Sequence, residues 1–413
     1  MKIIFIISLL SLSIYSSSYI SIPFKIKSNI TKEDNEIIEY LLYKGIYIDI
    51  KIGSENEEFS LPLKMRNYPT FISSFSSNIK SKKYNENNSK TYIKLDKNII
   101  KPIEDKLEGY KSLDSFSINN KIKINNFNFI LTQNQIIDES GGIGLKISTS
   151  IQDISSFHNV SNFINQLKKQ KLINSFYFWF NFKNENEGLF IIGKEPFEIE
   201  PKKFQKNNSN IINTGINYGR NRWIIKLLNA TFNDKQCFIG PVSQVEILTE
   251  IGLIYGVNSF RNIVFNDFFF QNGCFEKKSK FFSYFYCNEK IVDIKNFSDI
   301  IFTLEDKSKI IFSYKDLFYN YKGYNYFLIV FAKENNWLFG QIFLKKYYLV
   351  FNSDQKVINF YYKTETNNFN FLIILCIIFS LIIIGLIGYL IYFKKLFNLK
   401  KKKRANELED DYE

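Results

Sequence analysis

The sequence predicts an all-β protein in two lobes, followed by one transmembrane helix. Short runs of alternating apolar and polar residues, separated by polar turns, recur along most of the 413 residues, which is typical of strands with one buried face. Residues 161–172 are the one internal stretch with apolar residues at helical spacing, and Ser161 is suited to cap that helix. Near the C-terminus, Phe371–Phe393 is 23 residues long and uncharged, so it can cross a bilayer as a helix.

The first 18 residues have the layout of a secretory signal peptide. Lys2 precedes an apolar stretch, Ile3–Leu12, and Ser16–Ser18 supply small residues for cleavage. We therefore expect residues 1–18 to direct the chain into the secretory pathway.

The charges around Phe371–Phe393 predict its orientation. A basic cluster that ends in Lys400–Arg404 follows the apolar run, whereas Lys363 is the one basic residue just before it. Lys and Arg residues that flank a membrane span are usually found on its cytosolic side, so residues 394–413 are predicted to form a short cytosolic tail. Its basic cluster is expected to contact anionic lipid. The large domain would then be luminal or extracellular, at the plasma membrane or an endolysosomal membrane.

The composition excludes several classes of function. The net charge is +13, but the lysines are scattered and form no basic-aromatic module, so we expect no nucleic-acid partner. His158 is the single histidine, and no group of His, Cys and carboxylates has ligand spacing. The sequence therefore predicts no metal, no cofactor and no Ser-His-Asp set.

Cysteines and glycosylation motifs fit a luminal domain. Cys376 lies in the apolar run, whereas Cys274 and Cys287 are close enough to close a short loop, and we predict a disulfide between them. The rival pairing uses Cys237. Six N-x-S/T motifs, which are candidate N-glycosylation sites, begin at Asn29, Asn87, Asn159, Asn207, Asn229 and Asn296.

The luminal chain begins with a polar stretch and two strands. Residues 19–44 include a charged patch and are expected to be a linker or a short pro-segment. Residues 47–52 and 59–63 alternate and predict strands. Lys64–Asn67 then interrupts the apolar pattern before Phe71-Ile72. A loop between two buried strands often carries function.

The pattern continues through two similar halves. A passage of small residues, Gly141–Leu145, allows close backbone approach, and residues 176–182 and 188–193 predict a hairpin that closes the first half. Strands resume at Trp223. The remaining predicted strands lie at 98–103, 115–118, 122–124, 127–131 and within 337–360.

These pieces, in this order, resemble the pepsin-like aspartic proteases. YIDIKIGSENEEFSL resembles the opening strands of that family, SGGIGL its apolar-apolar-Gly passage, and GLFIIGKEP its lobe-closing hairpin. NWLFGQIFLKKYYLVFNSDQKVINFYY is similar to the last hairpin of the second lobe. The resemblance implies an N-terminal lobe at 45–200 and a C-terminal lobe at 201–362.

The family's chemistry needs two aspartates, one from each lobe. Two carboxyls about 3 Å apart cannot both ionise, so they share one proton and together activate water. Here the first Asp-Thr-Gly-Ser motif falls on Lys64–Asn67, and counting back from Leu253 places the second aspartate at Leu248. The flap tyrosine falls on Pro102. The resemblance therefore implies a catalytically inactive member, because neither lysine nor leucine can share that proton.

A rival alignment keeps one acid. A deletion of two residues sets Glu250-Ile251-Gly252 against the second Asp-Thr-Gly. Glu250 would still face Lys64, which gives an ion pair rather than a proton-sharing pair.

Three functions remain open at this point. The first is a non-catalytic, membrane-anchored protein that binds peptides or proteins in the cleft between its lobes. The second is an active aspartic-type endopeptidase that carries out proteolysis with a divergent pair of acids. The third is a structural surface protein.

Overall fold

The computed structural model describes most of the chain. The described residues are 19–32, 36–66, 69–77, 79–95, 108–119, 122–134, 139–147, 162–204, 212–215, 222–332, 336–361 and 369–409. They fall into two compact units, Met1–Lys363 and Thr364–Glu413. The predicted signal peptide, the strand predicted at 98–103, Pro102, His158, Asn159 and Asn207 lie outside the described residues.

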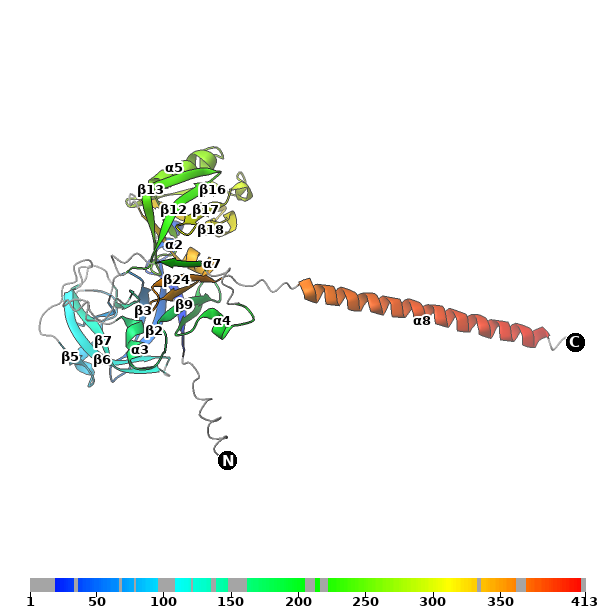
Figure 1. Ribbon diagram of the computed structural model, residues 1–413, viewed down its shortest axis with the longest axis horizontal. Coiled ribbons are helices and arrows are strands. Elements are labelled where there is room, and N and C mark those ends of the chain that lie inside the picture. Colours follow the sequence, from blue (N-terminus) through cyan, green and yellow to red (C-terminus); the bar gives the residue numbers. More distant parts are fainter. Residues whose placement is uncertain are drawn as a thin grey trace, which may run out of the picture. The chain divides into compact units, whose positions relative to one another are not determined.

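The first unit is built on two sheets, which confirms the all-β, two-lobed prediction (Figure 1). In the described residues the larger sheet has 13 strands, in the order β11-β24-β23-β9-β10-β1-β2-β3-β8-β4-β7-β6-β5. Its strands are β1 (Ile20–Ser28), β2 (Lys44–Ile52), β3 (Glu57–Lys64), β4 (Phe71–Ser73), β5 (Ile93–Lys94), β6 (Glu108–Ile118), β7 (Ile122–Asn134), β8 (Gly141–Gly144), β9 (Tyr177–Phe182), β10 (Glu187–Ile192), β11 (Ile212–Gly215), β23 (Tyr348–Asn352) and β24 (Val357–Tyr361).

The smaller sheet belongs to the C-terminal lobe. Its main path runs β18-β17-β12-β13-β22-β14-β21-β16-β20-β19, with β15 paired to β16. Its strands are β12 (Ile224–Phe232), β13 (Lys235–Ile247), β14 (Ile254–Gly256), β15 (Phe275–Lys278), β16 (Phe282–Asn288), β17 (Ile300–Leu304), β18 (Lys309–Phe312), β19 (Phe318–Tyr321), β20 (Tyr324–Phe327), β21 (Ile329–Ala332) and β22 (Trp337–Phe339).

Helices in this unit are short. They are α2 (Ile37–Leu42), α3 (Phe163–Lys169), α4 (Pro196–Ile199), α5 (Asn258–Val264), α6 (Tyr314–Leu317) and α7 (Gln341–Lys346). The predicted helix at 161–172 is confirmed as α3, although Asn162 rather than Ser161 caps it, through a hydrogen bond that its side chain accepts from Asn165 N. The sequence did not predict α2, α4, α5, α6 and α7, which are four to seven residues long. Helix α3 also has seven residues, but its apolar spacing continues past its end to Leu172.

Residues 19–32 and 36–44, which the sequence predicted as a linker or short pro-segment, contain strand β1, helix α2 and the start of β2. Strand β1 pairs with β10 on one side and with β2 on the other. Every second side chain of β1, from Ile20 to Ile26, is buried. Helix α2 packs its buried apolar side chains against the C-terminal lobe, next to Leu253 and Leu328. This segment is therefore part of the core of the first unit.

The two lobes repeat one strand arrangement. In the N-terminal lobe β3 pairs in parallel with β8, β8 in antiparallel with β4, and β4 in parallel with β7. In the C-terminal lobe β13, β22, β14 and β21 pair with the same directions in the same sequence. The C-terminal ends of β3 and β13 are therefore equivalent places in the two lobes.

The second unit is the long helix α8 (Phe369–Glu409). It contains one stretch, Ile377–Asn398, that is long and apolar enough to cross a membrane, with a mean hydropathy of 2.2. The predicted apolar helix at Phe371–Phe393 is confirmed, because α8 includes this whole range. The helix also continues through Lys400–Arg404, the basic cluster of the predicted tail.

Candidate functional site

The site lies where β3 and β13 end. Where β3 pairs with β8, Leu63 lies opposite Ile143. Where β13 pairs with β22, Ile247 lies opposite Phe339. Leu145 N donates to the carbonyl of Lys64 at 2.8 Å. The partners of Leu63 and Ile247 each directly precede a glycine, Gly144 or Gly340, so the residues that follow Leu63 and Ile247, Lys64 and Leu248, are topologically equivalent.

The side chain of Lys64 packs closely against the backbone of Gly142, in the passage of small residues at Gly141–Leu145. A Cβ at Gly142 would lie 3.1 Å from Lys64 Cγ and 2.8 Å from the ring of Phe71. A larger residue at Gly142 would therefore displace the lysine side chain. This is the close approach that the run of small residues predicted.

Lys64 is a buried cation with a buried partner. Its Nζ lies 2.9 Å from Glu139 Oε1, and each side chain is 9% exposed. A charge in such a place needs an opposite charge or several hydrogen bonds. The sequence analysis missed Glu139, although an acid placed just before the Gly141–Leu145 passage was the available signal.

Leu248 is buried, and the two residues that follow it connect the lobes. Thr249 Oγ1 donates to the carbonyl of Leu63 at 2.6 Å. The carboxylate of Glu250 accepts hydrogen bonds from the backbone N–H of Met65 at 3.2 Å and of Thr249 at 2.9 Å. Glu250 therefore holds the Lys64 loop and the Leu248 loop together.

A second acid, Glu246, lies between two arginines at this junction. Its Oε1 is 3.4 Å from Arg66 Nε, and its Oε2 is 3.5 Å from Arg222 Nη1. Burial raises the pKa of the Glu246 carboxyl above its ordinary value, the two arginines lower it in part, and nearby Glu250 raises it. The ion pair of Glu246 with Arg66 links β13 to the loop after β3.

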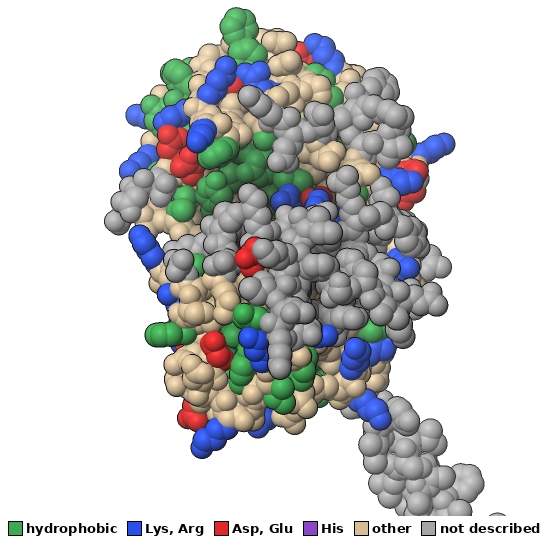
Figure 2. Space-filling view, turned by 90° about the vertical axis from the view of Figure 1, so that its left-hand side faces the viewer, with side chains coloured by type: hydrophobic (Ala, Val, Ile, Leu, Met, Phe, Trp, Pro, Cys, Tyr) green, Lys and Arg blue, Asp and Glu red, His purple; other side chains and the backbone are tan. Residues whose placement is uncertain are grey.

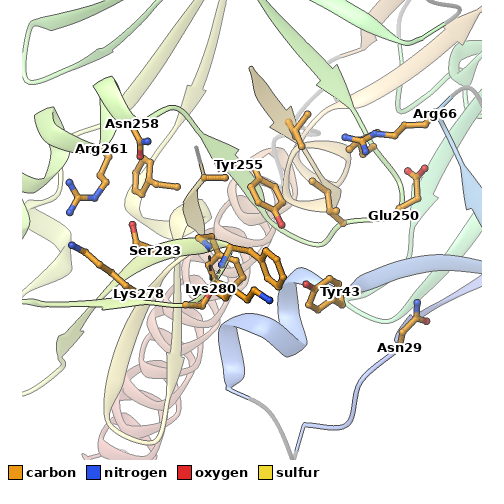
Figure 3. A pocket seen from close by; sticks show the side chains of 18 of the residues that line it. Asn29, Tyr43, Arg66, Glu250, Tyr255, Asn258, Arg261, Lys278, Lys280 and Ser283 are labelled. Carbon is orange, nitrogen blue, oxygen red and sulfur yellow. Dashed lines mark hydrogen bonds between the residues drawn. The ribbon is translucent and has the colours of Figure 1, made fainter. Parts of the chain in front are cut away.

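These residues border a cavity of about 1110 Å³ between the lobes. Lys64, Glu139, Leu248 and Glu250 line one part of it, and Glu276 together with residues 278–283 lines another. Figure 2 shows a hollow across this face, with apolar side chains inside it and Lys or Arg side chains beside them. In Figure 3, Arg66 and Glu250 lie at one end of the pocket.

The N-terminal segment also reaches the cavity. Asn29 and Tyr43 line it (Figure 3). Asn29 Oδ1 accepts a hydrogen bond from the hydroxyl of Tyr47. Among the other candidate glycosylation sites, Asn87 and Asn296 are exposed and Asn229 is half-buried.

The predicted disulfide between Cys274 and Cys287 is confirmed. It closes the hairpin of β15 and β16 on one wall of the cavity. Cys237 is a buried free thiol whose Sγ lies 3.2 Å from Ser259 Oγ, and burial raises its pKa. The rival pairing through Cys237 is therefore wrong.

Within the described ranges, no group of three or more His, Cys, Asp and Glu side chains could hold a metal ion. The described site contains buried ion pairs, backbone N–H groups that donate to Glu250, and a cavity lined by apolar and charged side chains.

Comparison with known proteins agrees with this geometry. The family model described as eukaryotic aspartyl protease matches residues 46–362, well over half of the 413-residue chain. A search of curated proteins finds no significant match. The matched range includes both strand repeats and the cavity between them, and the chain therefore belongs to the eukaryotic aspartyl protease family.

Proposed function

We propose that this protein is a membrane-anchored, non-catalytic aspartyl protease relative that binds extended peptides or proteins in the cavity between its lobes. One observation carries the proposal. The equivalent ends of β3 and β13 bear Lys64 and Leu248, which we take as the positions of the two catalytic aspartates. Neither side chain can act as a carboxylic acid.

The surroundings of Lys64 support the absence of catalysis. Proteolysis by this family needs two acids that share one proton, so that one activates water and the other polarises the substrate carbonyl. The Lys64 ammonium pairs with Glu139 at 2.9 Å. Leu248 offers no proton and no lone pair, so no acid faces a second acid at these two positions.

Active proteolysis remains the second candidate, because Glu139 and Glu250 both line the cavity. Their hydrogen bonds argue against that role. Glu139 pairs with Lys64, and Glu250 accepts backbone N–H groups from both loops. The strand register also favours Leu248 over Glu250 as the second catalytic position, because Leu248 follows directly on Ile247.

The cavity supports peptide binding. Its volume of about 1110 Å³ is slightly larger than the ~300–1,000 Å³ that is usual for ligand sites, which suits an extended peptide. Extended peptides bind to β-rich surfaces through backbone hydrogen bonds and side-chain pockets. A structural surface protein has no need of such a cavity, which makes the third function less well supported.

Helix α8 supports the membrane anchor, since Ile377–Asn398 has the length and apolarity of a span. With the predicted signal peptide and the basic flank after the span, it favours a large luminal or extracellular domain and a cytosolic C-terminus. The membrane would be that of a compartment of the secretory pathway or the cell surface.

A cleavage and binding assay on the full chain in detergent tests the proposal. We expect no cleavage of a random peptide library between acidic and neutral pH, and measurable capture of peptides from the same library. Lys64→Asp and Leu248→Asp introduced singly should remain inactive, because each restores only one acid.

Cleavage by the unmodified chain that a statine-type inhibitor blocks, and that Glu250→Gln abolishes, would establish the endopeptidase instead. Absence of both cleavage and capture would favour the structural surface protein.

A further inference from the structure

We infer that the cavity selects acidic peptides, which place their carboxylates against Lys278 and Lys280 on the C-terminal lobe. This inference rests on the proposed peptide-binding function and names the ligand class of the same cavity. Lys278 is the last residue of β15, Lys280 lies in the turn before β16, and both line the cavity.

The other cations of the cavity already have acidic partners. Lys64 pairs with Glu139 at 2.9 Å. Arg261 donates from Nε and Nη2 to one oxygen of Glu276, at 3.0 and 2.5 Å. Arg66 pairs with Glu246, as described above. These charges largely cancel each other and leave little attraction for a ligand.

Lys278 and Lys280 are different. Both are exposed, and neither has a carboxylate partner among the residues that the structure describes. Glu250, the remaining acid of the cavity, already accepts two backbone N–H groups. Five cationic and three acidic side chains line the cavity, an excess of two positive charges, and Lys278 and Lys280 place two of these cations on one wall. In Figure 3, Lys278 lies at the same end of the pocket as Arg261 and Asn258.

The turn that bears the lysines is held in place. Ser279 Oγ accepts hydrogen bonds from the backbone N–H of Phe281 at 3.3 Å and of Phe282 at 3.2 Å. The Cys274–Cys287 disulfide fixes the base of the same hairpin. A ligand that binds here does not have to order this segment, which lowers the cost of association.

An apolar group accompanies the two ammonium groups. The Phe281 side chain is 68% exposed and lines the cavity, and Lys280 Nζ lies 5.3 Å from the centre of its ring. An Asp or Glu next to an apolar residue in a peptide would meet both features. A neutral peptide would gain only the apolar contact.

Two peptide pools test this on the full chain in detergent. Both are random at apolar positions, and the remaining positions are Asp and Glu in one pool and Asn and Gln in the other. We expect the acidic pool to bind about tenfold more tightly, from two partly exposed ion pairs. This preference should shrink as salt is raised.

The variant Lys278→Gln/Lys280→Gln should lose the preference while it keeps its binding of the neutral pool. The variant Lys290→Gln/Lys295→Gln is the matched control, because it removes two exposed lysines of the same lobe that do not line the cavity. Thermal unfolding of both variants checks that they fold.

Equal binding of the two pools overturns this inference and leaves the proposed function in place. A preference that survives in Lys278→Gln/Lys280→Gln overturns the assignment to these lysines. Failure of both pools to bind overturns the proposed function and this inference with it.

Discussion

At the residue scale, the buried Lys64–Glu139 pair is the main electrostatic feature at the end of β3. Both side chains are only 9% exposed, so each charge has lost most of its hydration. Their attraction offsets this loss only while both are present. The pair therefore stabilises the cavity wall as a unit rather than through either residue alone.

Loss of one partner should be costly. We expect Lys64→Met or Glu139→Gln to lower the free energy of unfolding by about 3–5 kcal/mol, because a buried charge or dipole loses its partner. The double variant should lose much less free energy of unfolding than the two single variants lose together. A double-mutant cycle by urea denaturation measures this coupling.

The exposed pair of Lys25 and Asp49, at 3.0 Å, provides the control. Lys25→Met should change the free energy of unfolding by less than about 1 kcal/mol. Additive losses at Lys64 and Glu139 would mean that the two side chains do not act together.

Glu246 predicts a pH dependence. Burial raises its pKa from the ordinary value of 4.5 in spite of Arg66 and Arg222. The folded chain thus binds this proton more tightly than the unfolded chain. The stability that the group contributes is complete below pH 4.5 and is lost as the pH rises through its raised pKa.

We expect the stability of the natural chain, relative to Glu246→Gln, to fall as the pH rises from acidic to neutral. Urea unfolding at a series of pH values measures the difference. Glu305→Gln, an exposed acid 3.0 Å from Lys226, is the control. A difference that grows with pH would show that the arginines outweigh burial.

At the element scale, β1 and α2 join the N-terminal segment to both lobes. Strand β1 lies between β10 and β2 in the larger sheet. Helix α2 packs on the C-terminal lobe, and Glu36 beside it accepts a hydrogen bond from the Tyr284 hydroxyl and pairs with Lys277 at 2.5 Å. Removal of this segment would open the sheet at β1 and expose apolar surface on both lobes.

We therefore expect the mature protein to keep residues 19–44. N-terminal sequencing of protein purified from cells should find a start near residue 19. Phe24→Ala should lower the free energy of unfolding by about 3–5 kcal/mol, because Phe24 is 1% exposed. A folded mature chain that starts near residue 45 would show that the segment is a removable pro-segment.

At the scale of the whole molecule, each unit has its own physical role. The first unit buries its apolar side chains in a core shared by the two sheets. The second exposes them: the described side chains of Ile377–Asn398 are unburied. An exposed apolar helix of this length is stable only where a lipid or a partner covers it.

We expect alkaline carbonate to leave the protein in the membrane pellet. A stop codon after Lys363 should release the first unit into the lumen or the medium. Protease added to sealed vesicles should remove only a tag at the C-terminus, because the basic flank predicts a cytosolic location for that end. Protection of the tag would reverse the predicted orientation.

Several structural features were predictable because their signals are local. Cys274 and Cys287 are 13 residues apart, and helix α3 shows its own apolar spacing. Strand β1 was missed although Ile20–Ile26 alternates, because the charged patch that follows it led to the linker interpretation. The Glu139 partner of Lys64 is 75 residues away in the chain, and no local pattern records such a pairing.

The sequence by itself determined the fold class, the family resemblance and the absence of aspartate where the family motifs fall. These depend on residue types at fixed positions along the chain. Only the tertiary structure decided what surrounds Lys64 and Leu248: a buried Lys64–Glu139 pair, a Glu250 carboxylate that holds both loops, and a cavity with two lysines on one wall. The physical reason is that charges act through space, so their partners are set by how distant strands pack rather than by their order in the chain.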